Sequence, residues 1–290
     1  MKTAWLIVNG FLTSEKFEEI YQWLIDAAAK REITLRKITN DQLTSIIPAS
    51  NRELDWKQKP EFVIFWDKDI KLYKLLEQVG FRVFNNSRAI EICDDKGLTF
   101  LTLKNKGIKM PQTYPAPMTF HKEYKELAFV HQVGETIGYP MIIKENKGSF
   151  GEQVYLVNDF REAIDRITEI GHSEFVMQEY VKSSKGRDIR INVVGDKVVT
   201  AMERFNFNDF RANVTNGGSM KRCEITKDQE EMAIKACKAI GLDFGGVDLL
   251  FDENNQPVMC EINSNAHFKN IYDCTGVNVA EHIIDYILSK

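Results

Sequence analysis

Three oxygen-bearing side chains near the end of the sequence are the first candidates for chemistry. Asp248 lies in the apolar run 245–251, and Glu261 and Asn263 lie in a second run, 257–263. The residues between the runs favour a turn, so a β-hairpin is predicted. Side chains two apart on a strand share a face, so Glu261 and Asn263 point the same way, and pairing can bring Asp248 to the same end. This donor set suits Mg²⁺ held with substrate phosphates, but the polar edge of an ordinary hairpin is an alternative.

A lysine followed by a glycine-containing loop is the second candidate. Lys144 ends the apolar run 140–144, and four residues of the loop that follows are Gly148, Ser149, Phe150 and Gly151. Glycines let backbone N–H groups approach a phosphate closely. The G-x-x-x-x-G-K-[ST] spacing of a Walker P-loop is absent. Taken alone, the loop is explained better by a plain hairpin turn.

The composition is that of a soluble globular protein. Of the 290 residues, 43% are hydrophobic and 28% are charged, which is enough chain for about two or three domains with sizeable cores. The net charge of -4 argues against bulk nucleic-acid binding, and no apolar run is long enough to span a bilayer. The start of the chain, 1–10, is predicted to be a buried strand because its apolar core is too short for a signal peptide. We therefore expect a cytoplasmic protein with neither membrane nor nucleic acid as a partner.

The cysteines and histidines form no recognisable metal motif. The five cysteines are an odd number without a C-x-x-C pair, which predicts reduced thiols in a cytosolic protein. The five histidines include no H-x-x-x-H pair, so a transition-metal site is not predicted.

Strand and helix patterns alternate along the first 90 residues. Strands are predicted at 3–8, 33–38, 62–66 and 82–84. Helices are predicted between 14 and 28, at 40–47 and at 70–79. This alternation is typical of a small doubly wound domain. No G-x-G-x-x-G follows the first strand, so the dinucleotide fingerprint is missing.

The rest of the chain reads as two further units. Residues 86–106 are predicted to be mostly helical with an interruption near 94–97, and prolines at 111, 115 and 117 mark the entry into the second unit. Further strands are predicted at 140–144, 153–157 and 175–181, with paired strands from 187 and the hairpin near the end. Further helices are predicted at about 122–137, 160–170, 229–240 and 277–288. The predicted domains are 1–90, 91–185 and 186–290.

The order and spacing of these residues resemble the ATP-grasp superfamily, and within it the RimK-like α-L-glutamate ligases that modify ribosomal protein S6. The resemblance covers nearly the whole chain. It is carried by Lys96, Lys144, Gly148 to Gly151, Gln178-Glu179-Tyr180-Val181, Gly186 to Arg190, Arg204, Arg211-Ala212-Asn213, and Asp248 with Glu261-Ile262-Asn263. It implies an α/β (α+β) ATP-grasp fold with an N-terminal, doubly wound pre-ATP-grasp domain.

The resemblance also implies a role for each matched residue. Lys144, and with it Lys96, would contact the nucleotide phosphates, with Gly148, Ser149, Phe150 and Gly151 as a flap over them. Adenine and ribose would lie against Gln178, Glu179, Tyr180 and Val181, with Asp188 nearby. The catalytic set would be Arg190, Arg204 and Arg211, with Arg190 facing the γ-phosphate or acyl phosphate and Asn213 helping Arg211 to hold phosphate. Asp248, Glu261 and Asn263 would carry Mg²⁺, with two ions expected and Mn²⁺ as the alternative ion.

The chemistry implied by the resemblance is ATP-dependent ligation. ATP phosphorylates a carboxylate, and an amine attacks the acyl phosphate to form an amide or peptide bond. Such chemistry needs charge neutralisation and alignment, which Mg²⁺, Lys and Arg supply. The expected amine donor is an amino acid, with glutamate favoured, and the acceptor is a carboxylate of a peptide, a protein C-terminus or a small metabolite. The alternatives are a ligase acting on a ribosomal peptide or a small amino acid, and a non-catalytic ATP-binding sensor. The sequence does not decide whether the protein forms a homo-oligomer.

One segment departs from the family pattern. Residues 265–267 read Asn-Ala-His where the resemblance would place Ser-Pro-Gly. His267 either marks a different acceptor pocket or is an exposed loop residue, and the sequence leaves both interpretations open.

Overall fold

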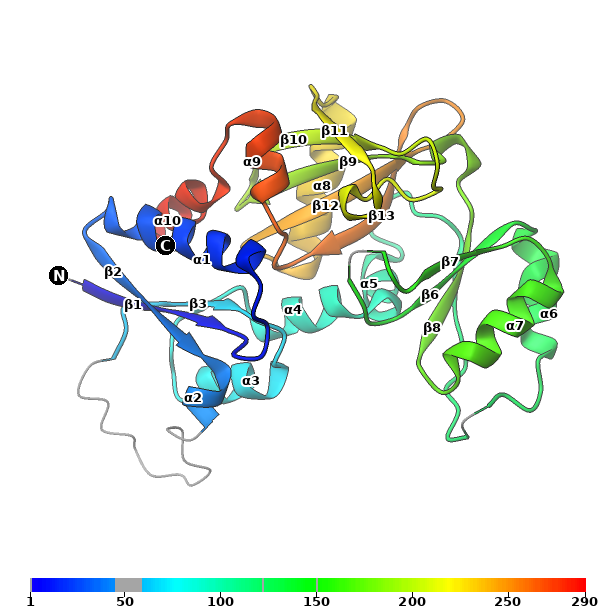
Figure 1. Ribbon diagram of the computed structural model, residues 1–290, viewed down its shortest axis with the longest axis horizontal. Helices are drawn as coiled ribbons and strands as arrows, with labels where there is room; N and C mark the ends of the chain where they lie inside the picture. Colours follow the sequence, from blue (N-terminus) through cyan, green and yellow to red (C-terminus); the bar gives the residue numbers. More distant parts are fainter. Residues whose placement is uncertain (1, 45–58, 122, 150) are drawn as a thin grey trace.

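The computed structural model describes residues 2–44, 59–121, 123–149 and 151–290, which form three β-sheets and the helices around them (Figure 1). The expected flap residue Phe150 and the end of the expected helix 40–47 lie outside the described residues. The sheets occupy successive parts of the chain: 2–84, 113–179 and 187–263. The domain boundaries 1–90, 91–185 and 186–290 stay a prediction.

The first sheet is parallel and has the strand order β2-β1-β3-β4. Its strands are β1 (Lys2–Val8), β2 (Ile33–Thr39), β3 (Val63–Trp66) and β4 (Val83–Phe84), and its helices are α1 (Glu15–Ala29), α2 (Asn40–Thr44) and α3 (Ile70–Gln78). Almost every residue of β1 and β3 is buried, as expected for strands covered on both faces. The alternation of strands and helices in the sequence therefore predicted the fold of this part correctly.

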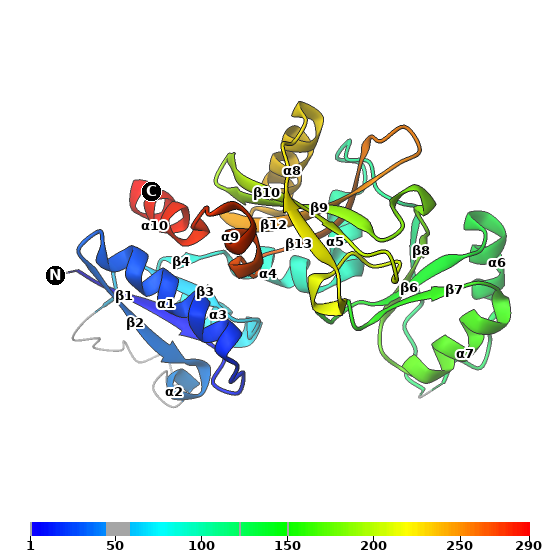
Figure 2. The same cartoon turned by 45° about the horizontal axis from the view of Figure 1, so that its top comes forward.

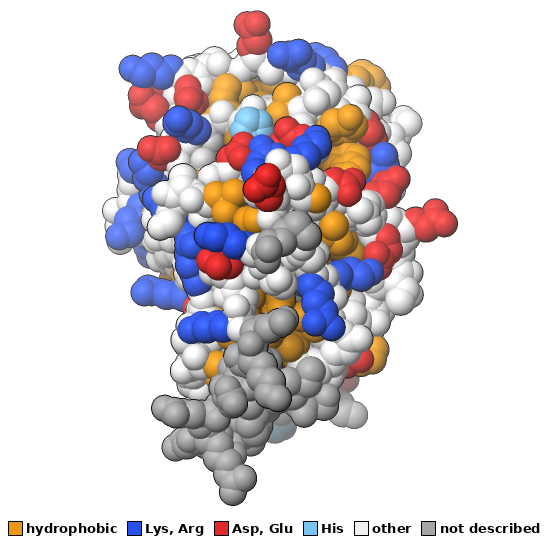
Figure 3. All heavy atoms as spheres, turned by 90° about the vertical axis from the view of Figure 1, so that its left-hand side faces the viewer, with side chains coloured by type: hydrophobic (Ala, Val, Ile, Leu, Met, Phe, Trp, Pro, Cys, Tyr) orange, Lys and Arg blue, Asp and Glu red, His pale blue; other side chains and the backbone are white. Residues whose placement is uncertain are grey.

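The last helix of the chain, α10 (Val279–Ser289), returns to the first sheet and packs on α1. Arg31 at the end of α1 forms a bidentate ion pair with Asp285 of α10, at 2.6 and 2.7 Å. Lys30 and Glu281 form a second ion pair across the same contact. Side chains of both signs are interspersed over this end of the molecule (Figure 3). The two ends of the chain are therefore packed together.

Two short helices lead to the second sheet. They are α4 (Ser87–Asp94) and α5 (Lys96–Leu103), and the side chains of Asn86 and Asp95 cap their N-termini. The sheet has the order β5-β8-β6-β7 and consists of β5 (Thr113–Pro115), β6 (Met141–Glu145), β7 (Val154–Val157) and β8 (Phe175–Glu179). It is covered by α6 (Ala128–Ile137) and α7 (Phe160–Ile170) (Figure 1).

The prediction that a helix begins near residue 122 was wrong, because α6 begins at Ala128. The hydroxyl of Tyr124 donates to the carbonyl of Pro117 at 2.7 Å, and the ring of Tyr124 packs on Phe129 and Phe175. These tertiary contacts hold the preceding segment outside the helix despite its helix-forming composition.

The third sheet lies between the other two (Figure 2) and has the order β11-β10-β9-β12-β13. Its strands are β9 (Arg187–Val194), β10 (Lys197–Phe205), β11 (Ser219–Arg222), β12 (Phe244–Phe251) and β13 (Pro257–Asn263). The helix α8 (Lys227–Ile240) begins with a capping box and packs on this sheet. The expected hairpin is present as β12 and β13.

The helix predicted at 277–288 is present as α10, and a short helix that was not predicted precedes it. The short helix α9 (Lys269–Thr275) ends at Gly276, which has a φ of +74° and separates it from α10. Seven residues are too few to give a periodic apolar signal in the sequence. In the described ranges, every helix is too short or too polar to span a lipid bilayer.

Candidate active site

A group of charged side chains occupies one face of the third sheet. Asp248 of β12 lies opposite Glu261 of β13 on one side and opposite Arg190 of β9 on the other. Arg204 of β10 lies opposite Asp188 of β9. Directly paired residues share a face of the sheet, and so do Asp188 and Arg190, which are two apart on one strand. The register of the strands alone therefore brings these five side chains together. The prediction that hairpin pairing brings Asp248 close to Glu261 is confirmed.

Two arginines and two aspartates of this group form a buried network of ion pairs. Arg190 donates through Nε and Nη2 to the two carboxylate oxygens of Asp248, at 2.6 Å each. Arg204 donates in the same way to Asp188 at 2.7 Å, and its Nη2 also donates to Asp248 at 2.9 Å. Arg204 is 5% exposed and Asp248 is 4% exposed. Bidentate pairs of this kind combine strength with fixed geometry, so the network holds the face of the sheet rigid.

The network sets the charge state of its members. Burial alone would raise the pKa of Asp248, but Arg190 and Arg204 outweigh it and hold the pKa below its ordinary value. Burial would lower the pKa of Arg204, and the two carboxylates reverse that shift and raise the pKa. Asp248 is therefore an ionised carboxylate near neutral pH, as a metal ligand must be.

The oxygens at this position fit a magnesium ion. Asp248 accepts three N–H bonds, and a carboxylate offers about four lone-pair positions, so one remains for a cation. Within the described residues, the side chains of Glu261 and Asn263 make no hydrogen bond or salt bridge. No group of three or more His, Cys, Asp or Glu in the same residues could hold a metal by itself. Such a partial donor set suits Mg²⁺, which usually takes further ligands from phosphates and water.

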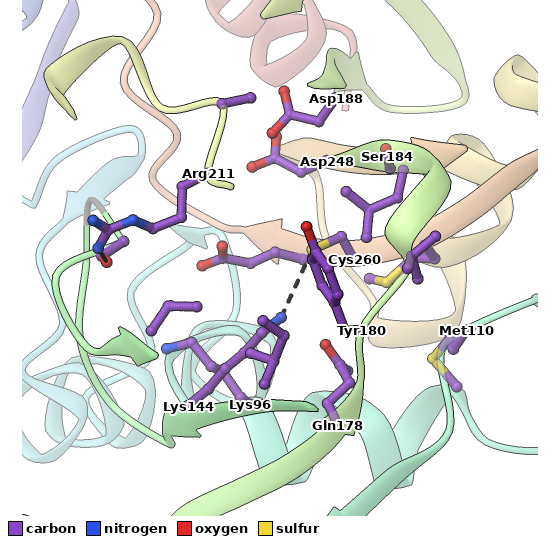
Figure 4. A pocket seen from close by; sticks show the side chains of 18 of the residues that line it. Lys96, Met110, Lys144, Gln178, Tyr180, Ser184, Asp188, Arg211, Asp248 and Cys260 are labelled. Carbon is purple, nitrogen blue, oxygen red and sulfur yellow. Dashed lines mark hydrogen bonds between the residues drawn. The ribbon is translucent and has the colours of Figure 1, made fainter. Parts of the chain in front are cut away.

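A first cavity lies between the second and third sheets (Figure 4). Figure 4 shows Lys96 and Lys144 on one side of it and Asp188 and Asp248 on the other. The structure brings most of the expected nucleotide-binding residues together in its lining: Lys96, Lys144, Gly151, Gln178, Glu179, Tyr180, Val181, Asp188, Arg204, Arg211, Asn213, Asp248 and Glu261.

The two lysines present their ammonium groups to this cavity from α5 and β6. Lys144 is 8% exposed, and its Nζ donates to the sulfur of Cys260, a weak acceptor, at 3.8 Å. Lys96 donates to the carbonyl of Asn146 at 3.4 Å, and burial, then the charge of Lys144, lowers its pKa although Glu261 opposes the shift. One buried and one partly buried ammonium group, each with only a weak hydrogen bond, are suited to bind phosphate oxygens.

The glycine loop is joined to the third sheet by one arginine. Gly148 has a φ of +140°, and a Cβ there would lie 2.3 Å from Oε1 of Gln153, so only glycine fits. Arg211 donates through Nη1 to the carbonyl of Gly151 at 2.6 Å and is itself held by Asp209. Ser149 accepts a weak bond from Lys68 at 3.5 Å. The loop therefore lies where the two cavities adjoin, with Gly151 in the lining of both.

The segment expected to receive adenine lies at the end of β8. The side chain of Gln178 donates to the hydroxyl of Thr113 at 2.7 Å, and Glu179 accepts from the backbone N–H of Gln112 at 3.1 Å. The ring of Tyr180 stands edge-on to Phe210. These contacts fix the segment between the second and third sheets.

A second cavity of about 480 Å³ adjoins the first. It is enclosed by the loop after β1, the start of α1, the end of β3 and the loop after β13. The two cavities share Cys93, Gly151, Arg204, Asn213 and Glu261 in their linings. Asp248 lines only the first cavity, and Asn263 lines only the second. The expected metal ligands therefore lie across the junction of the two cavities.

Reasoning from the sequence missed most of the second cavity. Lys16 and Asp67 of the N-terminal part line it, and neither belongs to a recognisable motif. Three buried acceptor atoms in its lining residues have no hydrogen-bond partner among the described residues: Oδ2 of Asp67, Oδ1 of Asn265 and Nδ1 of His267. Among the lining residues from the N-terminal part and from the loop after β13, only His267 and its neighbours gave a signal in the sequence, as a departure from the family pattern.

His267 is not an exposed loop residue. Its Nε2 lies 3.0 Å from the carbonyl oxygen of Lys16, so the proton of the neutral ring is on Nε2, and the ring packs edge-on against Phe17. Burial is the main cause that lowers its pKa to about 4. His267 is therefore neutral at pH 7 and links the loop after β13 to the start of α1.

His267→Gln is expected to make stability less sensitive to acid. The unfolded chain takes up a proton at the ordinary histidine pKa near 6.5, whereas the folded chain resists it until about pH 4. Stability is therefore lost as the pH falls through this window, by about 1–2 kcal/mol between pH 7 and pH 5 after allowance for partial exposure. Urea unfolding at the two pH values measures the difference. His172→Gln, at an exposed histidine, is the control. An equal loss of stability in wild type and His267→Gln would contradict this prediction.

Fold and site together define the class of protein. A parallel N-terminal sheet precedes two sheets that enclose a cavity with lysines on one side and carboxylates on the other. This is the arrangement of an ATP-grasp enzyme, an ATP-dependent ligase that forms carbon–nitrogen bonds. The chain belongs to the RimK-like ATP-grasp family, because the RimK-like ATP-grasp domain matches residues 93–287. The predicted family, fold and enzyme class are confirmed.

Two relatives are similar over most of their length. The chain is 35% identical to a probable alpha-L-glutamate ligase of Legionella pneumophila over 218 residues, which cover 74% of this chain and 70% of that protein. It is 29% identical to N-acetylaspartylglutamate synthase A of Homo sapiens over an alignment of 300 residues, which covers 96% and 75%. Both names contain the word glutamate.

Solved structures show the same fold. The ATP-grasp ligase PsnB, in complex with a phosphomimetic variant of its minimal precursor, Mg and ADP, superposes with a TM-score of 0.73 at 15% identity, covering 100% of this chain and 98% of that chain. The nucleotide and the ion of that complex agree with the expectation of ATP and Mg²⁺ in general. The number of ions stays a prediction.

Proposed function

We propose that this ligase joins the amino group of glutamate to a carboxylate of an acidic acceptor, with ATP and Mg²⁺, and releases ADP. The observation that carries the proposal is the meeting of two cavities at Glu261. A nucleotide in the first cavity would present its γ-phosphate to an acceptor in the second. The names of the two relatives support glutamate as the amino acid. The acceptor is a small acid, a peptide or a protein C-terminus.

The residues of the first cavity would bind and orient the nucleotide. Lys144 and Lys96 would hold phosphate oxygens, and Arg211, already bound to the flap at Gly151, would keep the flap closed over them. The segment 178–181 would receive the base. Asp248, Glu261 and Asn263 would hold magnesium, for which we propose two ions with Mn²⁺ as the alternative. The metal would neutralise the charge of the phosphates.

The two chemical steps balance with ATP as the only co-reactant. An oxygen of the acceptor carboxylate attacks the γ-phosphorus, and the bond to ADP breaks. The amine nitrogen of glutamate then attacks the acyl carbon, and the bond to phosphate breaks as the nitrogen loses its proton. Arg190 lines the second cavity and is held in place by Asp248, so it can pair with the negative charge of the acyl phosphate.

Release of ADP with pairs of substrates tests the proposal. Glutamate and other amino acids are each combined with acidic small molecules and with peptides ending in glutamate, and the products are identified by mass spectrometry. ADP and an amide product are expected only when an amine and a carboxylate acceptor are both present. A sensor would bind Mg-ATP yet release no ADP with any pair, and that result would overturn the proposal. We also propose a cytoplasmic location, which the free cysteines support.

Lys144→Ala is expected to raise the KM for ATP by about tenfold or more, because a charge-assisted contact to phosphate is lost. The KM for the acceptor should change little, since Lys144 lines the first cavity and not the second. Steady-state kinetics with ATP varied measures the effect. Lys147→Ala, in the neighbouring loop, is the control. An unchanged affinity for ATP in Lys144→Ala would contradict the role given to this lysine.

A further inference from the structure

We propose that Lys16 determines the specificity of the second cavity by binding a carboxylate of the acceptor other than the one that is activated, and that His267 positions it. The inference rests on the proposed function, because it takes the second cavity as the site of the acceptor. It goes beyond that function in assigning the recognition of a second acidic group to a residue of the N-terminal part of the chain.

The first observation is the place of Lys16. It is the second residue of α1 and lines the second cavity together with Arg190. Burial, and after it the charge of Arg190, lowers the pKa of Lys16. Two like charges that approach each other are stabilised when an anion lies between them. An acidic acceptor in this cavity supplies such an anion.

The second observation concerns the other charges of the cavity. Lys68 is paired with Asp94, and Arg190 and Arg204 are paired with the buried aspartates of the third sheet. The two arginines of the sheet are therefore held where the phosphate chemistry is proposed to take place. Lys68 and Lys16 both come from the N-terminal part, Lys68 from the loop after β3 and Lys16 from α1. The cavity thus has cationic groups on two different elements, which matches a substrate with two acidic groups.

The third observation is the link that fixes Lys16. The ring of His267 donates from Nε2 to the carbonyl of Lys16, and His267 follows the metal-binding strand by only four residues. Nδ2 of Asn265, in the same loop, donates to the carbonyl of Asp67 at the end of β3, at 3.0 Å. The loop after β13 therefore ties the N-terminal part to the third sheet at two points. These ties set the distance between Lys16 and the junction at Glu261.

Lys16→Met tests the proposal, since it removes the charge and keeps the length of the side chain. The assay is ADP release with glutamate as the amine and with succinate, citrate, N-acetylaspartate or a dipeptide ending in glutamate as acceptor. Each acid is compared with an analogue in which one carboxylate is replaced by a carboxamide. The KM for the best acid is expected to rise about tenfold or more in Lys16→Met, while the KM for ATP and for the monoamide stays within about twofold.

Matched variants separate recognition from structure. Lys16→Arg keeps the charge and should retain the low KM, and Lys30→Met removes an exposed lysine near the end of the same helix whose partner is Glu281. His267→Ala should raise the KM for the acid. His267→Gln can still donate to the carbonyl of Lys16, so its KM for the acid should stay close to that of wild type. Melting temperatures show that the variants are folded.

The result that overturns the inference is an equal change, or none, in the KM for the acid and its monoamide in Lys16→Met. Such a result leaves the proposed function intact if ADP release still depends on both substrates. Conversely, a wild-type protein that releases ADP with no pair of substrates contradicts the proposed function itself. The two failures are therefore distinguishable.

Discussion

Glu261→Gln is expected to lower kcat by about a hundredfold or more while the protein stays folded. Glu261 lies where the two cavities meet, and within the described residues its side chain makes no hydrogen bond or salt bridge. Its charge therefore has little structural use, so its removal should change the free energy of unfolding by only about 0.5 kcal/mol. If Glu261 holds the metal beside the phosphoryl group, as we propose, its loss removes electrostatic stabilisation from the transition state, which is typically worth about two to three orders of magnitude in rate.

A coupled assay of ADP release measures kcat, and urea unfolding measures stability. The matched control is Glu253→Gln, in the exposed turn of the same hairpin, which removes a charge of the same kind from a residue that lines neither cavity. Turnover in Glu261→Gln close to that of wild type would contradict the metal-binding role. A large loss of stability together with the loss of turnover would show that Glu261 supports the fold instead.

The core of the site could be predicted because it depends on local patterns. The two apolar runs and the polar turn between them predict the hairpin, and the period of two along a strand places Glu261 and Asn263 on one face. The structure adds that Asp248 lies directly opposite Glu261. Hard oxygen donors on adjacent strands of a hairpin can therefore be predicted from the sequence alone.

The ion-pair network could not be predicted in the same way. Whether Arg204 lies opposite Asp188 depends on the register of β9 against β10, and this register contains an irregularity between Val198 and Thr200. A shift of one residue would turn every side chain of the strand to the other face. Sequence spacing does not give the register of strands whose pairing is adjusted in this way, so the partners of Arg204 emerge only from the structure.

The second cavity was hidden for a different reason. Its walls come from both ends of the chain, and Lys16 and His267 are 251 residues apart. Neither residue has a local pattern that points to the other. For these two residues the clue in the sequence was the departure from Ser-Pro-Gly. In the structure, the ring of His267 in that segment donates to the first turn of α1.

Arg204→Ala is expected to lower the free energy of unfolding strongly. The guanidinium of Arg204 is 5% exposed and donates to both Asp188 and Asp248. Without it, two buried carboxylates face each other with only Arg190 to compensate them. Removal of one partner from a buried ion pair typically costs about 3–5 kcal/mol, because a charge is left without compensation. Urea unfolding at pH 7 should show a loss of this size.

A control variant and a double variant test whether the loss of stability comes from the buried charge of Arg204. Arg187→Ala removes a more exposed arginine that pairs with Glu203, and it should cost only about 1 kcal/mol.

Arg204→Met combined with Asp188→Leu removes charges of both signs and should recover much of the lost stability, since a buried pair replaced by apolar groups is often neutral. Turnover in the double variant should still be reduced if Arg204 also takes part in catalysis, as the family resemblance implies. Arg204→Ala with unchanged stability would show that the network does not hold the sheet, and a double variant with full activity would leave Arg204 a purely structural role.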